Sequence, residues 1–318
     1  MNTIKINGFN CRYELSGNLD SQETVVFVNA IASYIESWNP VRDVLAQDYK
    51  LLGYDLRGQW FSEVTHDEPY TFALMVEDLN ALMEELGVES AHIVSTSIGG
   101  EIAQLFETKY PHKVKSLSLI ATVSEINSLL FYQVVRWREA ANFAVERIEA
   151  TDNDDEVRRE VGRKFLQTLV PDIYSNSFIE KNEAVIKEKT AAFQTVCSKD
   201  FFQGQVYLCD MFFGLKDNEK LTGILPDIKS PSLVIVGEED MIKPPRYSKI
   251  IADGIPNSRL KVLKQAGHAL LIEKPDELSA LVKDFLDEHS KELSHAQHGN
   301  LRLPEQDKSV TDKIKVFY

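Results

Sequence analysis

Short runs rich in β-branched residues alternate with segments of helical periodicity through the first third of the chain. "TVVFVN" (Thr24–Asn29) is a continuous apolar run, which is typical of a strand buried on both faces. "YTFALMVEDLNALMEELG" (Tyr70–Gly87) instead has apolar residues at helical spacing and stops at a glycine. Further strands are expected at Cys11–Leu15, Tyr49–Leu56, Ala91–Ser95 and Ser116–Thr122. This alternation predicts an α/β protein with a mostly parallel central sheet and helices on both faces.

The alternation stops after Val123, which predicts how the chain is divided. Residues 1–123 form the first part of the α/β core, and residues 124–225 form a helical insertion without a convincing buried strand. Strands return in residues 226–290, which complete the core and end in a helix. Residues 291–318 are polar and lack periodicity, so we expect a tail there.

Composition excludes several classes of protein. Of the 318 residues, 43% are hydrophobic and 26% charged, which is ordinary for a globular protein. A net charge of -14 argues against a nucleic-acid partner. The chain has three widely spaced cysteines, no long apolar segment at its N-terminus and no run of 18 apolar residues. We therefore expect a cytoplasmic protein without a membrane span.

The stretch "HIVSTSIGGEIAQ" (His92–Gln104) passes from a predicted buried strand directly into a helix. A sharp strand-turn-helix elbow exposes the side chain at its apex, here Ser97, and needs small residues two positions to either side. Ser95 and Gly99 meet that need. The turn also directs the free N–H of Ile98 toward whatever binds beside Ser97. A small-residue turn with incidental hydroxyls is the alternative interpretation.

A nucleophilic serine needs a histidine base, and the histidine needs a carboxylate to orient it. "LVIVGEED" ends a predicted strand with Asp240 just beyond it, and "LKQAGH" leads a second strand toward His268. Both side chains would therefore lie at the same sheet edge as Ser97.

The order Ser97, Asp240, His268 resembles that of the α/β-hydrolase fold family, over roughly residues 3 to 290. The elbow, the V-G-x-x-D segment, the A-G-H segment with Glu273-Lys274-Pro275, and "YDLRGQWFS" (Tyr54–Ser62) all carry the resemblance. It implies a cap formed by the insertion over the nucleophile, and it favours Asp240 as the acid over Glu238 and Glu239.

Two departures from the family pattern stand out. Asn29-Ala30 replaces the usual His-Gly, so the resemblance assigns the second oxyanion donor to the backbone N–H of Ile31, beside that of Ile98. A similar asparagine occurs in 3-oxoadipate enol-lactonase-like and hydroxyacyl-transferase-like members. Its side chain either shapes the loop or contacts substrate. Trp60 stands where the family pattern has glycine, and its effect is left open.

Aromatic residues in and near the insertion are candidates for an apolar substrate pocket under the cap, although ordinary helix packing explains them equally well. With Asn29, the candidates are Trp38, Phe131, Trp137, Phe201, Phe202, Tyr207, Phe212 and Phe213.

Other chemically active side chains are weaker candidates. Ser95 would point into the sheet, and Cys209-Asp210 has no evident base beside it. A metal site is not expected, because His289, His295 and His298 are best interpreted as solvated histidines.

The predicted function is a serine hydrolase that cleaves a carboxylic ester, lactone or thioester of a small or medium apolar acyl substrate through an acyl-enzyme. No cofactor is expected, and the partner is a small-molecule substrate. An acyltransferase with the same triad, or a ligand-binding or regulatory protein on a hydrolase scaffold, are the alternatives. The sequence does not define the oligomeric state.

Overall fold

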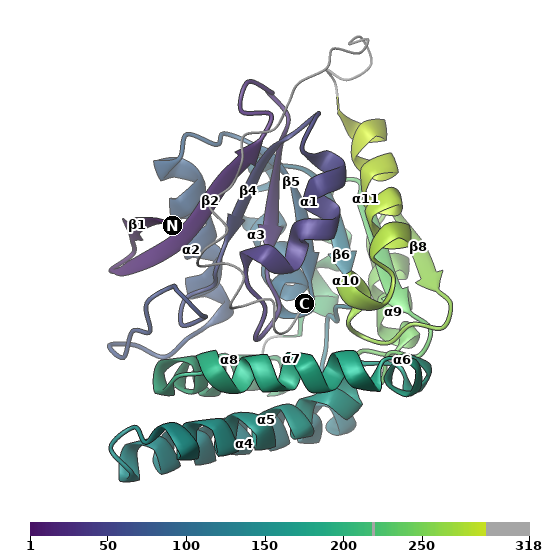
Figure 1. Ribbon diagram of the computed structural model, residues 1–318. Helices are drawn as coiled ribbons and strands as arrows, with labels where there is room; N and C mark the ends of the chain where they lie inside the picture. The colour runs from purple at the N-terminus through teal and green to yellow at the C-terminus, as the bar shows by residue number, and fades with distance from the viewer. Residues whose placement is uncertain (218–219, 291–318) are drawn as a thin grey trace.

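A computed structural model describes residues 1–217 and 220–290 of the chain. Its centre is one eight-stranded sheet in the order β1-β2-β4-β3-β5-β6-β7-β8 (Figure 1). The strands are β1 (Asn2–Ile6), β2 (Phe9–Gly17), β3 (Thr24–Val28), β4 (Lys50–Tyr54), β5 (Ala91–Thr96), β6 (Val114–Ile120), β7 (Ser232–Gly237) and β8 (Ser258–Leu263). The first two strands form an antiparallel hairpin, and β2 is also antiparallel to β4; every later pairing is parallel. The predicted α/β class and mostly parallel sheet are confirmed.

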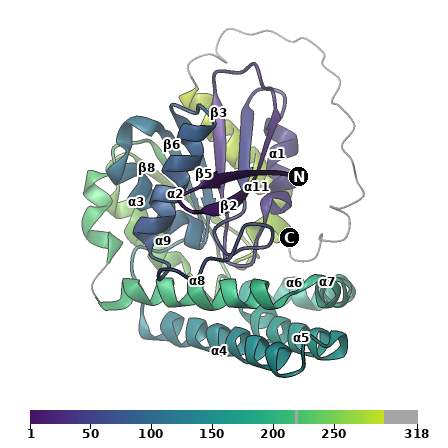
Figure 2. The same cartoon turned by 90° about the vertical axis from the view of Figure 1, so that its left-hand side faces the viewer.

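The central strands are apolar on both faces because helices cover both faces. Every residue of β3, β5 and β7 is buried. On one face, α1 (Asn39–Leu45) packs against α11 (Pro275–His289), while α2 (Phe72–Glu85), α3 (Ile98–Lys109) and α9 (Pro245–Gly254) cover the other (Figure 2). The short helix α10 (Leu270–Glu273) leads into α11. Two apolar cores result, one on each side of the sheet.

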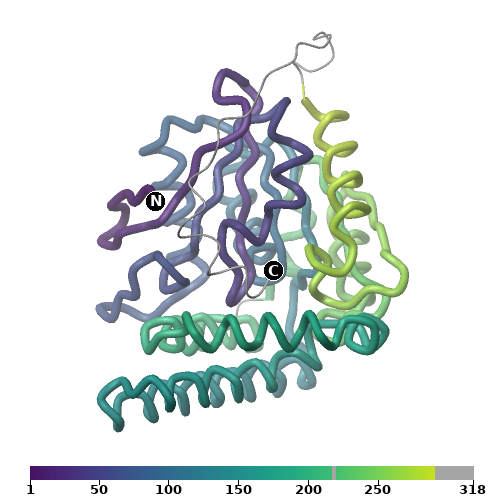
Figure 3. The backbone as a smooth tube through the Cα atoms, viewed as in Figure 1, coloured from purple at the N-terminus to yellow at the C-terminus, as the bar shows by residue number. Residues whose placement is uncertain are grey.

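Among the described residues, five α-helices between β6 and β7 form a separate layer across one end of the sheet (Figures 1 and 3). They are α4 (Ser128–Ala150), α5 (Asp155–Ile173), α6 (Asn176–Lys181), α7 (Glu183–Val196) and α8 (Lys199–Asp217). The long helix α4 packs against α5 and α8, and α7 and α8 lie nearer to the sheet than α4 and α5 do (Figures 1 and 2). We call α4 to α8 the helical layer.

Short 3-10 helices complete the fold at Ile35–Trp38, Pro111–Lys113 and Leu221–Asp227. No helix among the described residues is both long and apolar enough to cross a membrane. The predicted tail, residues 291–318, and with it His295 and His298, lies outside the described residues.

Candidate active site

Ser97 occupies the turn between β5 and α3 with φ +51°, a conformation that L-residues rarely adopt. Neighbouring small residues make this turn possible. A Cβ on Gly99 would lie 2.4 Å from the backbone oxygen of Val28, and one on Gly100 would lie 2.4 Å from Thr122 Oγ1. Larger residues would push α3 away from the sheet. The strain is therefore maintained by close packing around the elbow.

The other two predicted side chains lie beside Ser97. His268 Nε2 is 3.0 Å from Ser97 Oγ, and His268 Nδ1 is 2.7 Å from Asp240 Oδ2. Asp240 is almost fully buried, and its other carboxylate oxygen accepts the backbone N–H groups of Ile242 (2.9 Å) and Lys243 (2.7 Å). These bonds fix the carboxylate, and the carboxylate in turn fixes the imidazole. The arrangement leaves Nε2 facing the serine hydroxyl, as a general base requires.

The competing candidates lie elsewhere. Ser95 is fully buried in β5 and donates its hydroxyl to Ser118 O. Glu238 is exposed and pairs with Lys264 on the surface. Burial raises the pKa of the Cys209 thiol, which holds it in the protonated and less nucleophilic form. Among the described residues, no three His, Cys, Asp or Glu side chains are grouped as a metal site would need.

The two candidate oxyanion donors also have suitable surroundings. Ile98 is the first residue of α3, where backbone N–H groups have no preceding turn to bond. Ile31 follows β3, and within the described residues no acceptor for its N–H is found. Its neighbour Ala32 has φ +64°, and the N–H of Ala32 donates to Gln59 Oε1 at 2.8 Å. In this segment, then, Ile31 keeps a free donor while the next residue does not.

Asn29 and Trp38 lie in the core rather than in a substrate pocket. The Asn29 amide donates to Tyr54 O (2.7 Å) and accepts from Trp38 Nε1 (2.7 Å). The indole of Trp38 is fully buried and packs on Phe27, on the sheet face covered by α1 and α11. Both side chains therefore use their polar groups inside the protein core, and the expectation that they line a substrate pocket is wrong.

The other pocket candidates belong to the helical layer, and they contact one another, other residues of the layer, and the α/β core. Phe201 and Phe202 form a ring cluster with Phe165 and Phe193. Trp137 donates to Asp172 at 2.8 Å, and Tyr207 bonds His66 at 2.8 Å. Phe131 packs on Phe213, and the Phe212 ring has the ammonium of Lys243 5.0 Å from its centroid. Phe201, Tyr207 and Phe212 thus contact the α/β core, through Trp60, His66 and Lys243 respectively, whereas the Phe202 ring packs within the layer.

The helical layer is attached directly to the loop that carries His268. The N–H groups of His268 and Ala269 both donate to Ile173 O at 3.0 Å. The carboxylate of Glu273 accepts from the Ser175 hydroxyl (2.6 Å) and from Gly267 N–H (3.0 Å). Burial raises the pKa of Glu273, and these hydrogen bonds act in the opposite direction. The end of α5 is therefore anchored beside the candidate base.

A buried ion pair joins the elbow helix to the loop of Asp240. Lys243 Nζ lies 2.6 Å from Glu101 Oε1, and both side chains are almost completely buried. Sequence reasoning missed this pair and the contact of Gln59, and it named Glu273 only as part of a family segment, without a role. Glu101 lies one helical turn after Ser97, and Lys243 follows Asp240 by three residues, but only the folded chain makes them partners.

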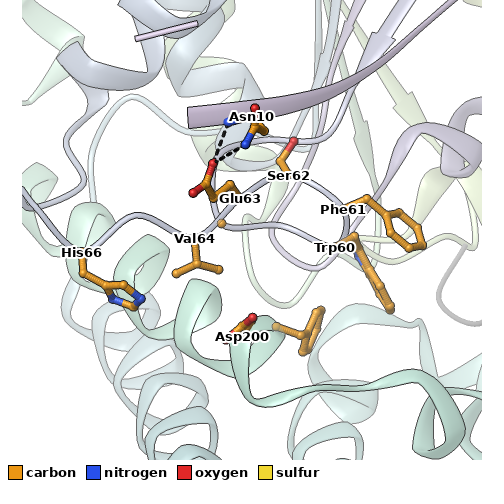
Figure 4. Close-up of a pocket in the computed structure, with 10 residues that line it drawn as sticks. Asn10, Trp60, Phe61, Ser62, Glu63, Val64, His66 and Asp200 are labelled. Carbon is orange, nitrogen blue, oxygen red and sulfur yellow. Dashed lines mark hydrogen bonds between the residues drawn. The ribbon is translucent and has the colours of Figure 1, made fainter. Parts of the chain in front are cut away.

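A cleft of about 410 Å³ opens between the loop after β4 and the first turn of α8 (Figure 4). Trp60, Phe61 and Phe201 supply aromatic walls, and Glu63 and Asp200 supply carboxylates. Trp60 lines this cleft and also contacts the Ile31 segment, since its Nε1 donates to Ala32 O at 2.8 Å. The triad side chains do not line the cleft.

The chain belongs to the α/β-hydrolase fold family, whose sequence pattern matches residues 23–275. Like the relatives below, it is an enzyme of the hydrolase type. It is 26% identical to a proline iminopeptidase of Lactobacillus helveticus over 300 residues, covering 89% of this chain and 96% of the relative. It is 24% identical to the monoacylglycerol lipase ABHD6 of Rattus norvegicus, covering 86% of this chain and 78% of that protein.

Solved structures give the same family. The α/β-hydrolase MGS-M2, from a Medee basin deep-sea metagenome library, aligns with a TM-score of 0.78 at 25% identity, covering 96% of this chain and all of that one. The enol-lactonase of Burkholderia xenovorans LB400 aligns with a TM-score of 0.73 at 22% identity, covering 90% and 99% of the two chains. The second likeness is one of fold.

Proposed function

We propose that this protein is a serine hydrolase that cleaves a carboxylic ester, lactone or thioester of a small or medium apolar acyl substrate. The observation that carries the proposal is the continuous contact from Ser97 Oγ through both ring nitrogens of His268 to Asp240. Family membership supports it, because the order Ser, Asp, His is that of α/β-hydrolases.

The proposed reaction has two halves. Ser97 Oγ attacks the substrate carbonyl while His268 Nε2 takes the hydroxyl proton, and the N–H groups of Ile31 and Ile98 stabilise the oxyanion. The tetrahedral adduct expels the leaving group, which receives the proton from His268, and an acyl-serine remains. Water, deprotonated by the same imidazole, then releases the acid and restores the serine. Asp240 holds the imidazole in the required tautomer throughout.

The helical layer supports the proposal that residues 124–225 act as a cap over this site. It lies across one end of the sheet and is bonded to the His268 loop through Ile173 and Ser175. A location in the cytoplasm is proposed from the three cysteines, all of which are free and buried.

Labelling with a fluorophosphonate probe tests the nucleophile. We expect native protein to be labelled and Ser97→Ala to be unlabelled. His268→Ala and Asp240→Asn should each reduce kcat by about 10³-fold or more, since these residues act as a unit. Glu238→Gln removes an exposed carboxylate two residues from Asp240 and should leave kcat unchanged. A native protein that resists the probe would contradict the proposal and favour a ligand-binding role on a hydrolase scaffold.

A substrate panel tests the reaction class. It should contain p-nitrophenyl esters of increasing chain length, lactones and acyl-thioesters, each with and without an alcohol acceptor. Transfer to the alcohol in preference to water would replace hydrolase by acyltransferase. Proline p-nitroanilide belongs in the panel because of the similarity to the proline iminopeptidase. Turnover of that amide above the esters would make an aminopeptidase the second candidate function.

A further inference from the structure

The peptide groups flanking Ala32 are held from both sides by two consecutive residues of the loop after β4. Gln59 Oε1 accepts the Ala32 N–H, and Trp60 Nε1 donates to the Ala32 carbonyl, both at 2.8 Å. Gln59 is fully buried, so its amide is committed to this contact and to the backbone nearby. Ala32 has φ +64°, which an alanine adopts only when its surroundings impose it. Gln59 and Trp60 are the groups that impose it.

Holding Ala32 limits the directions in which the N–H of the preceding residue, Ile31, can point. Ile31 and Ala32 form one tight turn, closed by the bond from Ser33 N–H to Ala30 O (3.2 Å). Gln59 holds the Ile31–Ala32 peptide, and the Ile31 N–H belongs to the preceding peptide, which is joined to the held one through the Ile31 Cα inside the same turn. Because Gln59 occupies the Ala32 N–H, the Ile31 N–H is the donor left free for an oxyanion. An oxyanion donor must lie about 2.7–3.1 Å from the oxyanion, so its placement matters for catalysis.

The loop is itself supported by the helical layer. Trp60 has φ +46°, and its ring contacts Phe201 of α8 (centroids 4.7 Å apart) and Tyr34 (5.3 Å). The loop and α8 also meet backbone to backbone. A Cβ on Gly204 of α8 would lie only 1.7 Å from Gly58 O. The contact therefore runs from α8, through Gly58 and Trp60, to Ala32.

We propose that Gln59 and Trp60 are positioning residues that aim the Ile31 N–H at the oxyanion, and that α8 braces them. The inference rests on the proposed serine hydrolase. It also gives Trp60 a role, since the bulky side chain at this position reaches the Ala32 carbonyl, which a glycine could not do.

The test uses full-length Trp60→Phe and Gln59→Leu with the best ester substrate. Trp60→Phe keeps a ring against Phe201 but removes the indole donor, and Gln59→Leu removes the acceptor at similar volume. Rates are divided by the concentration of active sites, measured as the end-point of fluorophosphonate labelling. We expect kcat per site to fall by about 10-fold or more in each variant, with KM changed less than about threefold.

A trifluoromethyl ketone inhibitor supplies a readout that a folding defect does not move. Ser97 Oγ adds to its carbonyl carbon, the hydroxyl proton passes to His268, and the resulting oxyanion occupies the same place as that of the substrate. Its inhibition constant should rise by about the factor by which kcat/KM falls, since both measure binding of a tetrahedral oxyanion.

Gln205→Leu is the matched control for Gln59→Leu. Gln205 is a buried glutamine of α8 whose amide donates within its own helix, to Phe201 O, and among the described residues no hydrogen bond joins it to the Ile31 segment. It should leave kcat per site unchanged. Unchanged kcat per site in both Trp60→Phe and Gln59→Leu, with native protein labelled at Ser97, would overturn the positioning role alone. Absence of labelling in native protein would overturn the proposed function and this inference together.

Discussion

Asn29 uses both ends of its amide inside the core. Its Nδ2 donates to Tyr54 O in β4, and its Oδ1 accepts from the Trp38 indole, each at 2.7 Å. Asn29 therefore joins the end of β3 to the neighbouring strand and to the 3-10 helix Ile35–Trp38. The side chain that replaces histidine in the family pattern acts here as a structural link directly before the Ile31 segment.

We predict that Asn29→Ala lowers the free energy of unfolding by about 1–3 kcal/mol, because it leaves a buried indole N–H and a buried carbonyl without partners. Urea unfolding measures this change. Any rise in KM should be the same for every substrate, since the amide faces the protein. Asn142→Ala is the control, because the Asn142 amide donates to Glu146 one turn along the exposed side of α4, and it should change stability by less than about 0.5 kcal/mol. A rise in KM confined to some substrates, at unchanged kcat, would indicate that Asn29 contacts substrate after all.

At the scale of elements, α8 joins the helical layer to the core. Its backbone at Gly204 touches the loop at Gly58, and its Phe201 ring packs on Trp60. Glycine is required at position 204 because no side-chain atom fits between the two backbones. The position of α8 and the shape of the loop after β4 therefore depend on each other.

We predict that Gly204→Ala destabilises the protein by about 1–3 kcal/mol, as overpacking a tight contact does. It should also reduce kcat per active site, because α8 must move away from Trp60. Thermal unfolding and titrated kinetics measure the two effects. Gly223→Ala adds the same methyl group in the 3-10 helix Leu221–Asp227, where a Cβ would meet nothing within 4 Å, so it should change neither quantity. Equal stability of Gly204→Ala and Gly223→Ala would contradict the prediction, because it would mean that α8 moves away from the loop with no loss of stability.

Elements with a regular pattern of apolar residues were the easiest to predict from the sequence. The run Thr24–Asn29 predicted a strand that the structure ends at Val28, and Tyr70–Gly87 predicted a helix that spans Phe72–Glu85. Continuous apolar runs and helical spacing are local signals, so they can be recognised without knowledge of the fold. Ser97, Asp240 and His268 could be nominated for the same reason, because each directly follows a predicted strand.

Partners across the fold could not be predicted in this way. Trp38 and Phe202 have the aromatic character expected of a pocket. Trp38 nevertheless packs on Phe27 on the sheet face that α1 and α11 cover, and Phe202 packs within the helical layer. Helical spacing predicts which face of a helix is buried, but it does not identify the residues that cover that face. Gln59 likewise stands in an unremarkable loop, and only its approach to Ala32 gives it a role.

At the scale of the whole molecule, two clusters of polar side chains lie at opposite ends of β5. The proposed triad of Ser97, Asp240 and His268 lies at the end of the sheet where the parallel strands end, on the side of the helical layer. A second cluster surrounds His92, the second residue of β5, and is completely buried. His92 Nδ1 lies 2.7 Å from Ser116 Oγ, and Nε2 lies 3.2 Å from both Glu23 Oε2 and Ser290 Oγ. The cluster links β5 and β6 to the end of α11.

This second cluster makes the fold sensitive to acid. Burial lowers the pKa of His92 to about 4 from 6.5, although Glu23 acts in the opposite direction. Between these two values the unfolded chain binds a proton at His92 that the folded protein does not. The free energy of unfolding therefore falls as the pH drops through this window, and the contribution is fully present above pH 6.5.

We predict that His92 accounts for a loss of about 2 kcal/mol in the free energy of unfolding between pH 7.5 and pH 5. His92→Gln should remove that part of the pH dependence, whatever it does to stability at a single pH. Urea unfolding at the two pH values measures the difference for each variant, and titration of carboxylates cancels in the comparison. His112→Gln removes an exposed histidine near the start of β6, and its free energy of unfolding should change between the two pH values as much as that of the native protein. If the free energy of unfolding of His92→Gln changed with pH as much as that of the native protein, the buried imidazole would be protonated as readily in the folded protein as in the unfolded chain.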